Sequence, residues 1–276
     1  TPEAIEELKA IYGLDKPLYI QFFSWIYSIL QLDFGISFTS GEKVKEEILS
    51  RIPITLTINI VSMILIFIIS LYFGIKSAMK KNSIFDRFTN QLSLLSFSMP
   101  SFYLALVLVL VFSIKFELFP IAGLHSVPND GSLNYYLDFA WHLALPIFII
   151  VFGGIGSLIL YIRALTIEIL KSDYIFFARA RGLDNKKILR YYILPNLYPP
   201  VITLLGLSLP GVIGGSVILE TIFSIDGMGL LFYQSALSHD YPVIMGILII
   251  GAFLTLIGNM FADLILLKLN PNYNEK

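Results

Sequence analysis

The sequence has no cysteine and little charge. Because none of its 276 residues is cysteine, disulfide bonds, thiolate nucleophiles and cysteine-ligated metal sites are excluded. Only 14% of the residues are Asp, Glu, Lys or Arg, whereas a typical soluble domain carries about 25%. Hydrophobic residues make up 56% of the chain, which excludes intrinsic disorder. A chain with so few charges cannot cover a water-facing surface, so we predict an integral membrane protein.

Further absences narrow the function. The formal net charge of −1 argues against a nucleic-acid-binding protein. The sequence lacks the pattern Gly-x-x-x-x-Gly-Lys-Ser/Thr, so no phosphate-binding loop of that kind is present. The absence of mid-membrane carboxylate chains and of an Arg-rich span disfavours proton-coupled carriers and voltage-gated channels. We expect no bound cofactor or metal, because the three histidines lack the spacing of metal ligands: His125, His142 and His239.

Long apolar runs define the fold class. A membrane helix needs about 20 apolar residues, and the runs here are continuous rather than alternating, which favours helices over a barrel. We therefore predict an all-α polytopic membrane helix bundle. Its five spans are expected at residues 54–75, 92–114, 143–162, 201–223 and 243–267.

The distribution of Lys and Arg predicts the orientation. Thirteen of the 19 basic residues lie in segments 76–90, 163–200 and 268–276. Basic residues favour the cytoplasmic side, so these segments are expected inside and residues 1–52 outside. The transmembrane domain then covers residues 53–270, followed by a cytoplasmic tail at 271–276.

The outer region is expected to be helical but not membrane-spanning. An amphipathic helix is predicted at residues 3–12, an interfacial segment at 17–32, and a third short helix at 42–50. Pro53 would stand at the start of the first span, where its missing N–H costs little. Because the chain begins with Thr rather than Met, we expect further residues to precede it.

Small residues in the fourth span allow two interpretations. Gly211 and Gly215 form a Gly-x-x-x-Gly pair, which in a continuous helix lies on one face and permits close packing. Alternatively, a deformable helix lines a moving pathway, since membrane helices break where they border a cavity. The pathway and packing candidates in this span are Pro210, Gly211, Gly214, Gly215 and Glu220. An ionisable residue such as Glu220, near the outer end, is a functional candidate by default.

The segment 163–200 is the longest inner loop and carries seven basic residues. Its spacing predicts a helix at 166–181, which Gly182 terminates, and a second helix capped by Asp184 and ended by Pro195. We expect the small residues at this turn to form a low-relief surface on which a partner protein docks. The alternative is a basic loop that binds anionic lipid headgroups.

A set of residues in this loop forms a recognisable motif: Asp173, Tyr174, Ala178, Arg179, Ala180, Arg181, Gly182, Leu183, Leu194 and Pro195. With these residues the loop resembles the coupling loop of the inner-membrane permeases of ABC transporters, of the dipeptide/oligopeptide type. Residues 51–56, 215–223, 227–230 and 240–242 also resemble that branch. The chain departs from the broader motif at Phe176, where the family has Glu, and at Phe177 and Tyr192.

The resemblance implies the pore-forming subunit of an ATP-driven importer for di- and oligopeptides, in the plasma (inner) membrane of a bacterium or archaeon. The implied partners are a second homologous permease, two ATPase subunits that bind ATP-Mg, an extracytoplasmic substrate-binding protein and membrane lipid. Members of this family have an additional N-terminal span. Oligosaccharides or nickel complexes remain alternative substrates. A stand-alone secondary carrier and a membrane scaffold are the alternative classes.

Overall fold

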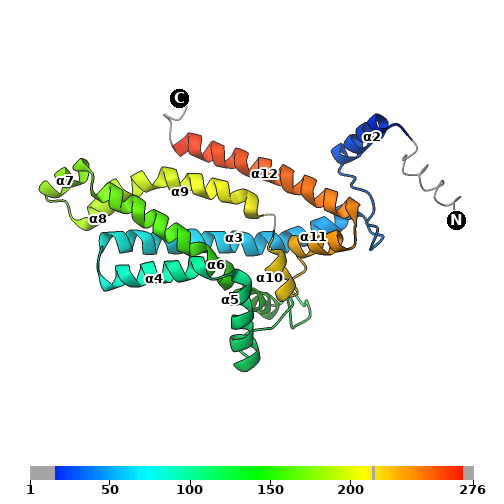
Figure 1. The fold of residues 1–276 in the computed structure, drawn as a ribbon, viewed down its shortest axis with the longest axis horizontal. Coiled ribbons are helices and arrows are strands. Elements are labelled where there is room, and N and C mark those ends of the chain that lie inside the picture. The colour runs from blue at the N-terminus through cyan, green and yellow to red at the C-terminus, as the bar shows by residue number, and fades with distance from the viewer. Residues whose placement is uncertain (1–15, 213–214, 270–276) are drawn as a thin grey trace.

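The computed structural model describes residues 16–212 and 215–269, and Figure 1 shows them as a set of packed helices. The α-helices are α2 (Leu18–Leu30), α3 (Val44–Met79), α4 (Ile84–Ser98), α5 (Ser101–Leu108), α6 (Leu133–Leu170), α7 (Asp173–Ala180), α8 (Asn185–Ile188), α9 (Leu194–Ser208), α10 (Val217–Ile222), α11 (Met228–Leu237) and α12 (Tyr241–Leu269). Two π-helical segments, η1 (Val109–Lys115) and η2 (Leu189–Ile193), and a 3-10 segment, η3 (Leu209–Val212), complete them. Within these described ranges there is no strand, only an isolated bridge between Ile36 and Lys43.

The predicted membrane helix bundle is confirmed, but its spans are not five uninterrupted helices. Among the described residues, α3, α6 and α12 are each long and apolar enough to cross a membrane. The pair formed by α4 and α5–η1 is a fourth candidate only if its two bent parts count as one span. Helices α3 and α6 run side by side, and α4 packs against α6 (Figure 1).

The first interruption lies in the predicted span 92–114. Helix α4 ends at Ser98 and α5 begins at Ser101, with a bend of 100° between them. Met99 is extended, with φ −85° and ψ 120°, as expected for a residue that precedes proline. Pro100 lacks an N–H and cannot continue the hydrogen-bond ladder of α4. A continuous helix through this position was therefore the wrong prediction.

The second interruption lies in the predicted span 201–223. Helix α9 tightens into η3 at Leu209, and the described residues Gly215 and Ser216 are not helical, so α10 begins at Val217. Gly215 has φ +64°, a conformation that is accessible to glycine and ends a right-handed helix. Gly211 and Gly215 therefore do not share one helix face, and the predicted packing pair is wrong.

The outer region differs in one respect from the sequence prediction. No separate helix covers residues 42–50, because α3 starts at Val44 and continues through Pro53 as one helix of 36 residues. Helix α2 occupies most of the predicted interfacial segment 17–32, and most of its large apolar side chains are exposed. The helix predicted at 3–12 lies outside the described residues.

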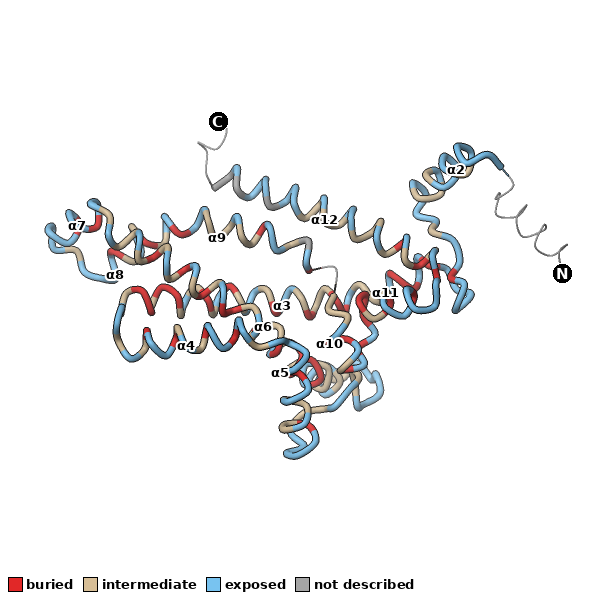
Figure 2. The backbone as a smooth tube through the Cα atoms, viewed as in Figure 1, coloured by how far each residue is buried: buried red, intermediate tan, exposed pale blue. Residues whose placement is uncertain are grey.

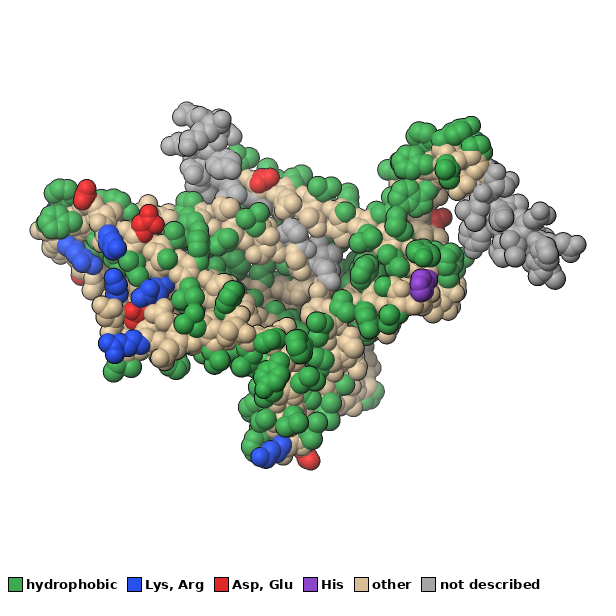
Figure 3. All heavy atoms as spheres, in the orientation of Figure 1, with side chains coloured by type: hydrophobic (Ala, Val, Ile, Leu, Met, Phe, Trp, Pro, Cys, Tyr) green, Lys and Arg blue, Asp and Glu red, His purple; other side chains and the backbone are tan. Residues whose placement is uncertain are grey.

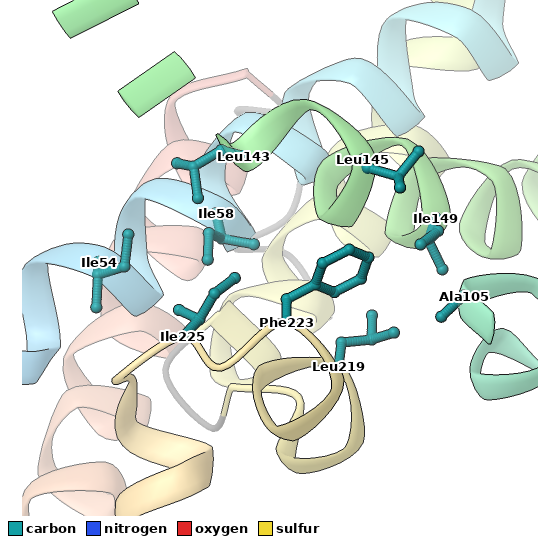
Figure 4. Packing of buried hydrophobic residues seen from close by; sticks show 9 residues of the cluster. All are labelled: Ile54, Ile58, Ala105, Leu143, Leu145, Ile149, Leu219, Phe223 and Ile225. Atoms are coloured by element: carbon teal, nitrogen blue, oxygen red, sulfur yellow. The ribbon is translucent and has the colours of Figure 1, made fainter. Parts of the chain in front are cut away.

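A cluster of buried side chains joins the two interrupted spans to the long helices (Figure 4). Phe223, just after α10, is 2% exposed and lies between side chains of α3, α6 and α5. Figure 2 shows that buried residues follow the helix faces that meet, whereas the outward face of α12 is exposed. Phe253 and Leu256 of α12 are exposed, and their large apolar side chains suit contact with lipid.

Candidate functional site

Helices α7 and α8 project at one end of the molecule and are joined by a tight turn (Figure 1). The turn lies at Gly182, where the spacing predicts it, and this residue has φ +79°. The N–H of Gly182 donates to the carbonyl of Arg179 at 2.9 Å, and the N–H of Leu183 donates to that of Ala178 at 3.2 Å. The Asp184 side chain accepts from the N–H of Lys187 at 2.9 Å and caps α8. Local sequence therefore specifies the turn and the cap. The helix predicted at 166–181 is wrong in its extent, because α6 continues to Leu170 and α7 begins only at Asp173, after an extended Ser172 with φ −71° and ψ 150°.

The inner face of α7 is fixed by packing. Ile175 and Ala178 are 1% and 2% exposed, and Ile175 belongs to a cluster with Ile188, Ile193 and Leu197. The prediction that Ala178 contributes to the outer surface is wrong, because its side chain faces inward. A small residue here lets α7 approach the rest of the loop closely.

The outer face of α7 carries two large apolar side chains. Phe176 and Phe177 are 69% and 63% exposed, and their rings meet edge to face with centroids 5.7 Å apart. Tyr174, Arg179 and Arg181 are exposed beside them, and Figure 3 shows Lys and Arg side chains gathered at this end of the molecule. Sequence reasoning treated the two phenylalanines only as departures from a motif. Their adjacency on a short helix whose other face is buried was the available signal.

The remaining residues of the predicted loop site occupy helix ends. Asp173 lies in the first turn of α7, where a negative charge is favourable. Leu194 is half-buried at the start of α9. Pro195 does not end the second helix as predicted, because it stands in the first turn of α9, which follows the π-helical segment η2 without a break. Proline is tolerated in a first turn, and the wider π turn before it adjusts the backbone.

A buried ion pair connects three of the long helices that precede the α7–α8 projection in the chain. Asp86 on α4 accepts from Arg163 on α6 twice, with Nε–Oδ1 at 2.7 Å and Nη2–Oδ2 at 2.9 Å. Ser77 on α3 donates to the same carboxylate, and the N–H of Asn82 donates to it at 2.8 Å. The side chain of Asp86 is 3% exposed and that of Arg163 is 21% exposed. This arrangement, which sequence reasoning missed, holds the ends of α3 and α4 against the helix that leads into α7.

Glu220 lies on α10 and is 4% exposed. Its Oε2 accepts from the N–H of Leu230 at 2.7 Å, and its Oε1 accepts from that of Ser216 at 3.3 Å. Three glycines pack around Glu220 so closely that an added Cβ would collide with the carboxylate or with the backbone of Val217: Gly215, Gly227 and Gly229. The carboxylate therefore joins the start of α10 to the first turn of α11 by backbone hydrogen bonds.

The segment that connects α10 to α11 is held against α3. The N–H of Met228 donates to Thr55 Oγ1 at 2.9 Å, and Arg51 Nε lies 2.8 Å from Asp226 Oδ1. Of the other candidates in the fourth span, Pro210 and Gly211 lie in η3, whereas Gly214 is outside the described residues.

The histidines do not converge on one site. His125 and His142 lie near Asp138, with Nδ1–oxygen distances of 3.7 Å and 3.4 Å, and His239 follows α11. The part of the chain that the structure describes contains no group of three or more metal-ligating residues suited to an ion.

Comparison with known proteins decides the family. The family described as "Binding-protein-dependent transport system inner membrane component" matches residues 70–275. The chain belongs to this family. The oligopeptide transport system permease protein AppB of Bacillus subtilis is 37% identical over 261 residues, which cover 94% of this chain and 82% of that protein.

Two further relatives carry other names. The peptidoglycan transport system permease protein YejB of Agrobacterium fabrum is 31% identical and covers 98% of this chain and 76% of its own length. The metal-staphylopine import system permease protein CntB of Staphylococcus aureus is 31% identical, with coverage of 100% and 84%. The chain is thus an ABC permease of the peptide type and a multi-pass membrane protein, the permease subunit of an importer.

A solved structure supports the fold of the permease. A chain of the MetNI methionine ABC transporter in inward-facing conformations aligns with a TM-score of 0.60 at 17% identity. The alignment covers 81% of this permease and 96% of that chain. At this level of identity the similarity concerns the helix arrangement alone.

Proposed function

We propose that this permease imports peptides. The observation that carries the proposal is the 37% identity over 94% of the chain to an oligopeptide permease. A second homologous permease would complete the pathway, two ATPase subunits that bind ATP-Mg would drive it, and an extracytoplasmic binding protein would deliver the peptide. The complex would lie in the plasma membrane of a bacterium or archaeon, with the basic α7–α8 end in the cytoplasm.

The α7–α8 projection is the proposed docking element for an ATPase subunit. Exposed aromatic and arginine side chains are the residue types that contribute most to protein interfaces. The buried face of α7 and the Asp86–Arg163 pair would transmit a displacement of α7 to α3, α4 and α6. Closure of the ATPase pair would then move the helices between inward-open and outward-open arrangements.

Replacing the exposed aromatics tests the docking element. Phe176→Ala with Phe177→Ala should weaken ATPase association about 30-fold or more, as for an interface residue that contributes about 2 kcal/mol or more. The matched control is Phe253→Ala, since Phe253 is 62% exposed on α12. Affinity of purified ATPase subunits for permease in nanodiscs is the measurement. Equal affinities for the double variant and the control would refute this role.

Uptake into proteoliposomes tests the substrate. The reconstituted complex with its binding protein should accumulate labelled di- or oligopeptides only when ATP is present on the α7–α8 side. A second candidate class is metal chelates, which the relative named for metal-staphylopine import favours. Accumulation of a metal chelate or an oligosaccharide without peptide uptake would contradict the proposal.

A further inference from the structure

A cleft of about 340 Å³ lies between α3, α6, α9 and η3. The described residues that line it are mainly apolar and include no ionisable side chain. Four polar side chains line it: Asn59, Ser62, Ser157 and Ser208. The cleft adjoins the interruption of the fourth span, and irregular backbone at membrane depth is tolerated where it borders a cavity.

Two of these polar groups are already satisfied within the chain. Asn59 Nδ2 donates to the carbonyl of Val212 at 2.7 Å and so connects α3 to the end of η3. Ser208 Oγ donates to the carbonyl of Leu204 at 2.8 Å. The first of these contacts holds the interrupted helix at the edge of the cleft.

Ser62 differs from them. It is 1% exposed, and its Oγ has no hydrogen-bond partner among the residues that the structure describes. Thr57, on the same helix, donates to the carbonyl four residues earlier at 2.7 Å, the usual arrangement for a helical hydroxyl. Thr89 also lacks a partner, but it does not line this cleft. A buried hydroxyl without a partner is unfavourable, so Ser62 retains an unused donor and acceptor beside the cleft.

We propose that this cleft is part of the solute path and that Ser62 and Ser157 bind neutral amide or hydroxyl groups of the transported solute. The inference rests on the proposed import function and assigns a solute-binding surface to this chain. Peptide backbone amides match the lining, because each offers one donor and one acceptor without charge. A charged terminus or side chain would find no counter-ion in this wall and must lie elsewhere along the path.

Uptake kinetics of Ser62→Ala in the complete reconstituted importer test the proposal. Loss of one neutral hydrogen bond should lower kcat/KM for peptide uptake about 2- to 10-fold. Thermal stability should stay unchanged or rise, because the variant removes an unpaired buried hydroxyl. Ser62→Thr restores the hydroxyl and should restore uptake.

The matched control is Ser70→Ala. Ser70 is also buried on α3, but its Oγ lies 3.5 Å from the carbonyl of Ile155 and it does not line the cleft. We expect wild-type uptake from this variant. Equal uptake by Ser62→Ala and wild type, or equal losses in Ser62→Ala and Ser70→Ala, would overturn the proposal.

A second measurement does not depend on the buried position. Because the permease has no cysteine, Ser157→Cys introduces the single thiol of this chain at an exposed wall residue of the cleft. Methyl methanethiosulfonate should modify this thiol, and saturating peptide should slow the modification. A modified variant with undiminished uptake, or modification indifferent to peptide, would overturn the assignment of the cleft. Failure of the unmodified wild-type complex to take up peptide would instead refute the proposed import function.

Discussion

Replacing Asp86 by Asn should destabilise the permease far more than the same change at an exposed ion pair. Asn cannot provide a charged partner to Arg163, which would remain mostly buried at 21% exposure. Removing one partner of a buried ion pair costs about 3–5 kcal/mol. Since Arg163 retains some contact with solvent and Asn keeps one acceptor oxygen, we expect about 3 kcal/mol, the lower end of that range.

The chain offers a control in the first turn of α3. Glu46 lies 4.0 Å from Lys43, and the side chains of both residues are exposed, at 70% and 75%. An exposed ion pair contributes about 0–1 kcal/mol. Glu46→Gln should therefore change the unfolding free energy by less than about 1 kcal/mol.

Equilibrium unfolding of the purified chain in detergent micelles measures both variants. A double variant, Asp86→Asn with Arg163→Gln, should be less destabilised than the sum of the single variants, because it removes the uncompensated charge. In the reconstituted complex, Asp86→Asn should also lower uptake per ATP hydrolysed, since Arg163 lies on α6, the helix that directly precedes α7 in the chain. An effect of Asp86→Asn no larger than that of Glu46→Gln would refute the reasoning.

Three further predictions follow from close contacts. Gly156→Ala should lower the unfolding free energy by about 1–3 kcal/mol through overpacking, because the added Cβ would lie 2.5 Å from a backbone oxygen of α4. Gly153→Ala should be tolerated, since nothing lies within 4 Å of the added Cβ. The unfolding midpoints of the two variants measure the difference. Glu220→Gln should lower the unfolding free energy by about 1–3 kcal/mol, since the amide nitrogen of Gln replaces one of the two acceptor oxygens, which face the N–H groups of Leu230 and Ser216. Hydrogen exchange in α11 measures this effect. Unchanged protection in α11 would contradict the prediction. Burial disfavours the charge on Asp240, but hydrogen bonds led by the one from Ser37 outweigh it and hold its pKa below the ordinary 3.8. The charged Asp240 carboxylate therefore stabilises the folded state fully above about pH 4, and this stabilisation is lost as the pH falls through the lower pKa of the folded state. Asp240→Asn should abolish this part of the pH dependence of the unfolding free energy. An unaltered pH dependence in the variant would contradict the prediction.

Local sequence was sufficient for several features. The turn at Gly182 and the cap at Asp184 form by bonds between near neighbours, so residue type and spacing predict them. Continuous apolar runs likewise predict membrane helices, because every backbone polar group must be satisfied within the helix. The five apolar runs did not reveal where two of the predicted helices break. A proline in a run does not settle this, because some prolines of this chain interrupt a helix and others do not. Pro53 lies inside the 36-residue α3, whereas α4 ends before Pro100.

The sequence by itself determined that this chain is a membrane helix bundle with a basic, helix-turn-helix loop, since hydropathy, charge and capping act over a few residues. Tertiary structure alone decided which side chains of that loop face inward and which remain exposed. It also paired Asp86 with Arg163, which are 77 residues apart, and enclosed Glu220 between glycines from two segments. Such contacts depend on how helices pack, and a linear pattern carries no information on which distant residues that packing brings within hydrogen-bond distance.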